Sequence, residues 1–183
     1  MSTPWISPAV WLLGASGADG VSTIEHFLAF TADSEGAWPP GDDLDNVSPF
    51  VVIVARESFK GLAAAQRLVV AHRDGEVGHG AQLLGLVTVA AAPTLDKAIR
   101  QHRDVVSSAF DHAWHIGWHR GLLSAALPHL ARWHPLDDGA VAAPRGIPAD
   151  VHRTGVELVN TAHSRLPELF PAQSTDLDLV DHS

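Results

Sequence analysis

The 183-residue chain contains no cysteine and no tyrosine, and basic side chains are few. Without cysteine, disulfides, thiolate metal ligands and cysteine nucleophiles are all excluded. Twelve Lys and Arg stand against 21 Asp and Glu, which gives a formal net charge of −9. Such a charge repels phosphate backbones, so we expect no direct non-specific binding of nucleic acid.

Long apolar runs are also missing. A membrane-spanning helix needs about 20 consecutive apolar residues, and the longest runs here, 9–13 and 83–92, are far shorter. No basic residues precede the first apolar stretch, as they would in a secretory signal. We therefore expect a cytoplasmic protein that makes no contact with membranes.

The composition is that of a globular protein. Apolar residues make up 46% of the chain and charged residues 18%, and the length suits one domain with a full core. We expect a single domain over residues 1–170. An acidic, flexible tail is expected over residues 171–183, where Asp176, Asp178 and Asp181 have few apolar neighbours to anchor them.

Apolar runs alternate with longer amphipathic stretches along the chain. Strands are predicted at 10–14, 50–55, 82–90 and 114–118, and helices at 21–30, 58–73, 94–110, 121–134 and 150–166. Residues 32–49 contain three prolines, two glycines and five acidic residues, which predicts a surface loop. Strands separated by helices imply right-handed crossovers. We therefore expect a three-layer α/β fold, with a mostly parallel sheet of four to five strands covered by helices on both faces.

A glycine-rich turn follows the first predicted strand and leads into the first predicted helix. This is the layout of a phosphate-binding loop, in which backbone amides hold the phosphates, a lysine reaches the terminal phosphates and a hydroxyl holds magnesium. Here Val21 occupies the position of the lysine, and Ala15 that of the first glycine. The candidate binding residues are Gly17, Gly20, Val21, Ser22 and Thr23. We expect no catalytic residue and no metal ligand among them.

Residues 16–23 resemble the loop of the ParA/MinD group of P-loop proteins, the deviant Walker A class, which reads Lys-Gly-Gly-x-Gly-Lys-[Ser/Thr]-Thr. The matching positions are Gly17, Gly20, Ser22 and Thr23, and the two lysines are replaced by Ser16 and Val21. Segments 51–67, 83–89 and 115–118 are similar to later strands and helices of that group, so the resemblance covers residues 10–125. It implies a P-loop fold, ATP and magnesium as ligands, and association with a second copy or a partner ATPase. The chain is also similar to small plasmid or mobile-element proteins of high-GC actinobacteria.

Two further features of that group are missing from the sequence. Its members have a strand that ends in a magnesium-binding aspartate before the strand at 50–55, and residues 32–49 show no such apolar run. Its adenine-reading asparagine would fall near Val89, where no amide stands.

Phosphoryl transfer depends on positioning and on electrostatic stabilisation, so a loop without lysine lacks its main catalytic group. Asp19 would also place a like charge against bound phosphates. We therefore expect no cofactor, and a non-catalytic binding or regulatory module that works as a homodimer or with a protein partner.

Two alternatives stay open. One is a nucleotide switch that binds ATP weakly through backbone amides and the Ser22 hydroxyl, with magnesium. The other is a dinucleotide-binding Rossmann protein, because residues 14–20 match Gly-x-x-Gly-x-x-Gly; the absence of tyrosine and of a charged residue ending a second strand argues against it. If the glycines only form a tight turn, Ser22 or Thr23 would cap the following helix.

Two other groups of residues could carry chemistry. His112, His115 and His119 have a spacing at which imidazoles on one helix face could bind zinc, but Gly117 and the neighbouring tryptophans argue against a helix there. Arg56 and Glu57 end a buried strand, at the edge where open α/β sheets bind ligands. They are candidates for a site, and an ion pair at a helix start would explain them equally well.

Overall fold

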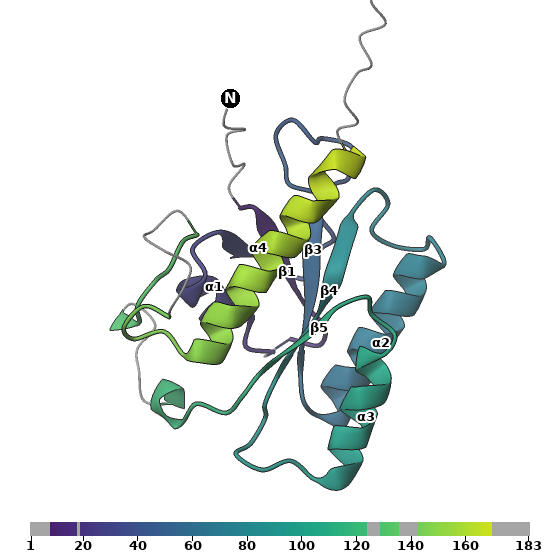
Figure 1. Cartoon of the computed structure of the whole chain (residues 1–183). Helices are drawn as coiled ribbons and strands as arrows, with labels where there is room; N and C mark the ends of the chain where they lie inside the picture. Colours follow the sequence, from purple (N-terminus) through teal and green to yellow (C-terminus); the bar gives the residue numbers. More distant parts are fainter. Residues whose placement is uncertain (1–7, 18, 124–128, 136–142, 170–183) are drawn as a thin grey trace, which may run out of the picture.

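The computed structural model describes residues 8–17, 19–123, 129–135 and 143–169. Its centre is a five-stranded, wholly parallel sheet with the strand order β2-β1-β3-β4-β5 (Figure 1). The strands are β1 Val10–Gly14, β2 Thr31–Asp33, β3 Phe50–Arg56, β4 Gln82–Val89 and β5 Ala113–Ile116. The predicted three-layer α/β architecture is therefore confirmed.

Helices cover both faces of this sheet (Figure 1). They are α1 Val21–Phe27, α2 Phe59–Arg73, α3 Lys97–Ser107 and α4 Ala149–Leu169, with a short 3-10 turn, η1, at Arg120–Leu123. The core divides in the same way: α1 and α4 pack on one face, and α2 and α3 on the other. Helix α2 begins as predicted, because the Ser58 hydroxyl accepts a hydrogen bond from the Gly61 backbone N–H at 3.1 Å.

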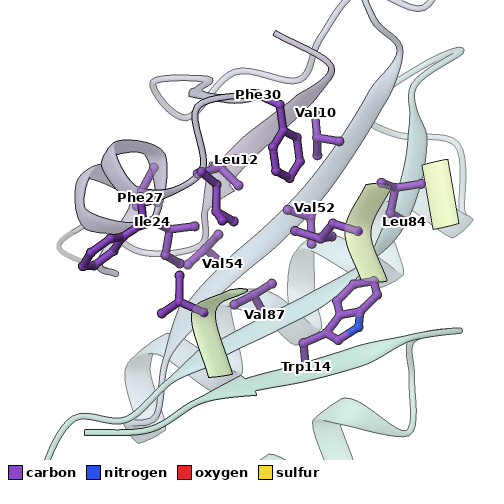
Figure 2. Packing of buried hydrophobic residues seen from close by; sticks show 14 of the residues in the cluster. Val10, Leu12, Ile24, Phe27, Phe30, Val52, Val54, Leu84, Val87 and Trp114 are labelled. Carbon is purple, nitrogen blue, oxygen red and sulfur yellow. The ribbon is translucent and has the colours of Figure 1, made fainter. Parts of the chain in front are cut away.

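β3 lies in the middle of the sheet, and its residues from Phe50 to Ala55 are all buried. Val52 and Val54 point into the core under α1 and α4 (Figure 2), whereas Val51, Ile53 and Ala55 pack under α2 and α3. Burial on both faces explains why this strand reads as a continuous apolar run instead of an alternating one. Each of the buried valine and isoleucine side chains stabilises the fold by about 1.5–3 kcal/mol.

The region after β1 differs from the prediction. Helix α1 ends at Phe27 instead of Phe30, because the chain turns there to bury Leu28 and Phe30 in the core. Thr31–Asp33 then pairs with β1 as the edge strand β2, so the predicted loop at 32–49 begins inside a strand. Three residues are too few to show a strand periodicity in the sequence.

The helix predicted at 121–134 is also wrong in the described part of that segment. Only the 3-10 turn at Arg120–Leu123 forms, and Trp133 makes an isolated bridge with Leu28. The Trp133 side chain is 2% exposed and packs edge-on against Phe30, so tertiary burial overrides the local helical pattern here. The predicted tail, residues 171–183, lies outside the described residues.

Candidate functional site

The carboxyl ends of the parallel strands meet at one edge of the sheet. In the sheet, β2 lies on one side of β1 and β3 lies on the other side, so the strand order reverses at β1. Ligands of open α/β sheets bind outside the carboxyl edge at such a reversal of strand order. The glycine loop after β1 and the Arg56-Glu57 pair at the end of β3 therefore lie where a site is expected, and we call this region the β1–β3 edge.

Two glycines give the loop its shape. Gly17 has a φ of 77° and Gly20 a φ of 88°, a left-handed conformation that other residues adopt only with strain. Gly20 is the N-cap of α1, and no side chain caps this helix. The alternative in which Ser22 or Thr23 caps the helix is therefore wrong.

Asp19 closes the loop from within. Its side chain is 2% exposed, and its Oδ2 atom accepts a hydrogen bond from the Ser16 backbone N–H at 2.7 Å. The Oδ1 atom accepts from the Ser16 hydroxyl at 3.0 Å and from the Arg56 backbone N–H at 3.2 Å. The expectation that this carboxylate faces a bound phosphate needs correction, because its oxygens are bonded inside the protein.

A cavity of about 370 Å³ lies between this loop and the end of β2. It is lined by Gly14, Gly17, Asp19, Gly20, Val21, Ser22, Asp33, Glu35 and Gly36. Three of these residues are acidic and none is basic. The lining is therefore negatively charged, whereas a phosphate site is normally positively charged. Four of the five candidate binding residues reach the cavity; Thr23 does not.

Asp33 is the functional candidate that the sequence interpretation missed. It is the last residue of β2, and its carboxylate accepts a hydrogen bond from the Glu35 backbone N–H at 2.7 Å. A second strand ending in an aspartate is therefore present, in contrast to the expectation for residues 32–49. Asp33 stands 19 residues after Gly14. This spacing would have identified it as a candidate if the strand had been recognised.

A second arrangement of polar groups surrounds Glu57, just after β3. The Glu57 side chain is fully buried, and its Oε1 atom is 2.7 Å from Nδ1 of His115 on β5 and 3.3 Å from Nη1 of Arg103 on α3. The Oε2 atom has no hydrogen-bond partner in the described structure. The predicted candidate Glu57 thus joins β3, β5 and α3 at the carboxyl edge.

Burial and neighbouring groups shift the pKa of Glu57 in opposite directions. Burial raises the pKa of this carboxyl, but hydrogen bonds from His115 and Thr88 and the positive charges of His115 and Arg103 lower it more. The net pKa lies below the ordinary glutamate value, so Glu57 is ionised at neutral pH. Because Nδ1 of His115 is bonded to this carboxylate, Nε2 is the ring nitrogen that can contact solvent. The His115 side chain is 47% exposed.

The three clustered histidines do not form a metal site. His115 pairs with Glu57, His119 lies 2.9 Å from both carboxylate oxygens of Asp150 in α4, and the His112 ring stacks on Trp114. Among the described residues no group of three potential ligands could hold a metal ion. The pKa of Asp150 is raised by burial but lowered more by the Gly117 N–H and by His119, so it lies below its ordinary value.

Comparisons with known protein families, with curated proteins and with solved structures find no match to this chain. Within the described ranges, no helix is long and apolar enough to cross a membrane.

Proposed function

We propose that this chain is a non-catalytic binding or regulatory module, in which the glycine loop after β1 does not hold phosphate. One observation carries the proposal: the Asp19 carboxylate takes the Ser16 backbone N–H that a bound anion would use. The loop therefore contains its own anion. For such a module we propose a protein partner, or a second copy of the chain, as the ligand.

The charge of the surroundings supports this proposal. Asp33 and Glu35 also line the cavity, so a polyphosphate would enter beside two further carboxylates. Val21 supplies no cation at the lysine position, and α1 has only seven residues. Val89, at the position where ATPases of the ParA/MinD group read adenine, is apolar and lies next to Gly20.

A variant of the loop tests the proposal. Val21→Lys restores the missing cation without changing the glycines. Because Asp19 occupies the loop from within, we expect Val21→Lys to bind ATP with magnesium no better than the natural chain in isothermal titration. Saturable binding below about 100 μM in this variant would show an open phosphate cradle and would support the weak ATP switch instead.

Dinucleotide binding is the second candidate, and Asp33 favours it. In Rossmann proteins an acidic residue about 20 residues after the first glycine, at the end of the second strand, bonds the ribose hydroxyls. Asp33 has this position, and it shares a cavity with Gly14, Gly17 and Gly20. Titration of the natural chain and of Asp33→Asn with NAD and with adenosine separates the two candidates. Binding that is lost in Asp33→Asn would support the dinucleotide hypothesis. Absence of binding to the natural chain supports the non-catalytic module.

A further inference from the structure

Positive charge is concentrated in one helical layer of this acidic protein. The first 55 residues contain seven Asp and Glu and no Lys or Arg. Helices α2 and α3 carry half of the twelve basic residues, namely Lys60, Arg67, Arg73, Lys97, Arg100 and Arg103. Their one carboxylate is Asp104, which Arg103 pairs at 3.2 Å. The outer side of this layer therefore attracts acidic groups.

Exposed apolar side chains are found in the same layer. Among the described residues, the large apolar side chains that remain exposed are Phe59, Val70 and Val105, at 58%, 48% and 62%. Phe59 and Val70 are eleven residues apart, or about three helical turns, so they share one side of α2. Cations beside exposed apolar groups are the features of a surface that binds another polypeptide.

A cavity of about 300 Å³ lies beside the C-terminal end of α2. Val69, Leu83 and Phe110 give it apolar walls, while His72, Arg73 and Arg165 add basic groups. Asp111 also lines it, and Arg165 pairs with this carboxylate at 3.4 Å. We call this cavity, together with the adjacent Val70, the α2-end surface.

The chain leaves α4 close to the α2-end surface. Arg165, which lines the cavity, lies four residues before Leu169, where the described part of α4 ends. The sequence then runs to Asp176-Leu177-Asp178-Leu179-Val180-Asp181, in which three carboxylates are interspersed with three aliphatic side chains. The six residues between Leu169 and Asp176 can span up to ~20 Å. This segment is therefore complementary to the nearby surface in both charge and apolar character.

We propose that residues 176–181 bind the α2-end surface of their own chain, with aliphatic side chains in the cavity and carboxylates beside Arg73. The segment then occupies a surface that would otherwise be open to an acidic, leucine-bearing segment of a partner. This inference goes beyond the proposed function and does not depend on the state of the glycine loop.

Because the chain has no cysteine, one introduced thiol can report on the cavity. Gln82→Cys places it on the half-buried cavity residue at the start of β4. In the full chain we expect maleimide to modify this thiol at least fivefold more slowly than in a chain that also carries Leu177→Ser and Leu179→Ser. Equal rates would overturn the proposal. His79→Cys, at an exposed residue outside the cavity lining, is the matched control and should react equally fast in both backgrounds.

A change on the surface itself provides the second test. Arg73 donates a hydrogen bond to the Ala109 carbonyl, so Arg73→Gln removes the charge but keeps a donor for that bond. We expect this variant to accelerate modification of Gln82→Cys by severalfold, while Arg153→Gln on the exposed side of α4 leaves the rate unchanged. Protection that rises with protein concentration would overturn the intramolecular contact, because a second copy would then supply the segment.

Discussion

The carboxylate of Asp19 accepts a hydrogen bond from the Arg56 backbone N–H at 3.2 Å, and so joins the loop after β1 to the end of β3. The same carboxylate holds the Ser16 backbone N–H and hydroxyl. One buried side chain therefore sets the geometry of the β1–β3 edge. Hydrogen bonds to a charged group are each worth about 1.5–3 kcal/mol, so this contact should be visible in the stability of the fold.

Replacing Asp19 by Asn should lower the free energy of unfolding by about 1–3 kcal/mol, because a neutral amide bonds the two backbone N–H groups less well and brings N–H donors of its own. Urea denaturation followed by tryptophan fluorescence measures this loss. Asp96→Asn is the matched control, since the Asp96 side chain makes no capping hydrogen bond and is exposed. A loss of less than 0.5 kcal/mol for Asp19→Asn, roughly the usual range for surface changes, would contradict the structural role.

Glu57 should make stability depend on acidity. Its folded pKa lies below the unfolded value of about 4.3, so its contribution is present above that pH and is lost as the pH falls through the folded pKa. Glu57→Gln should cost about 2 kcal/mol at pH 7, with the partly exposed His115 and Arg103 limiting the loss.

Urea denaturation of the natural chain and of Glu57→Gln across pH 3 to 7 tests this dependence. The difference between the two should be largest near pH 7 and should shrink below about pH 4. Exposed Glu76 provides the control. Glu76→Gln should have nearly the same free energy of unfolding as the natural chain at every pH. A difference that stays constant with pH would mean that Glu57 contributes through packing and not through its charge.

The contact between His119 and Asp150 should hold α4 to the end of β5. Asp150 also accepts a hydrogen bond from the Gly117 N–H at 2.8 Å, which adds to the same connection. We expect a double-mutant cycle with His119→Ala and Asp150→Asn to give a coupling energy of about 1 kcal/mol in thermal or urea unfolding at pH 6. Additive losses from the two substitutions would exclude a direct interaction.

Much of the fold was predictable because its strongest signals are local. The apolar run of β3 and the serine before α2 each identify one element from neighbouring residues. β2 was missed because three residues carry no usable period, and Trp133 contradicted a helical pattern because its burial against Phe30 depends on the fold as a whole.

The site was predictable in position and less so in chemistry. The glycine spacing indicates a turn after β1, and Gly17 and Gly20 adopt the conformation that such a turn needs. Spacing does not reveal where a side chain points, and Asp19 turns inward to amides of its own loop and of β3. The pairing of Glu57 with His115 depends on the neighbouring order of β3, β4 and β5, which no local pattern contains.

The most direct test of the central claim is isothermal titration of the natural chain with ATP and magnesium at neutral pH and low salt. A loop closed by Asp19 and surrounded by carboxylates predicts no saturable binding at ATP concentrations up to about 1 mM, a range in which a working phosphate loop would be filled. Saturable binding below about 100 μM would contradict the account, because the Ser16 amide would then have to release Asp19 for the nucleotide.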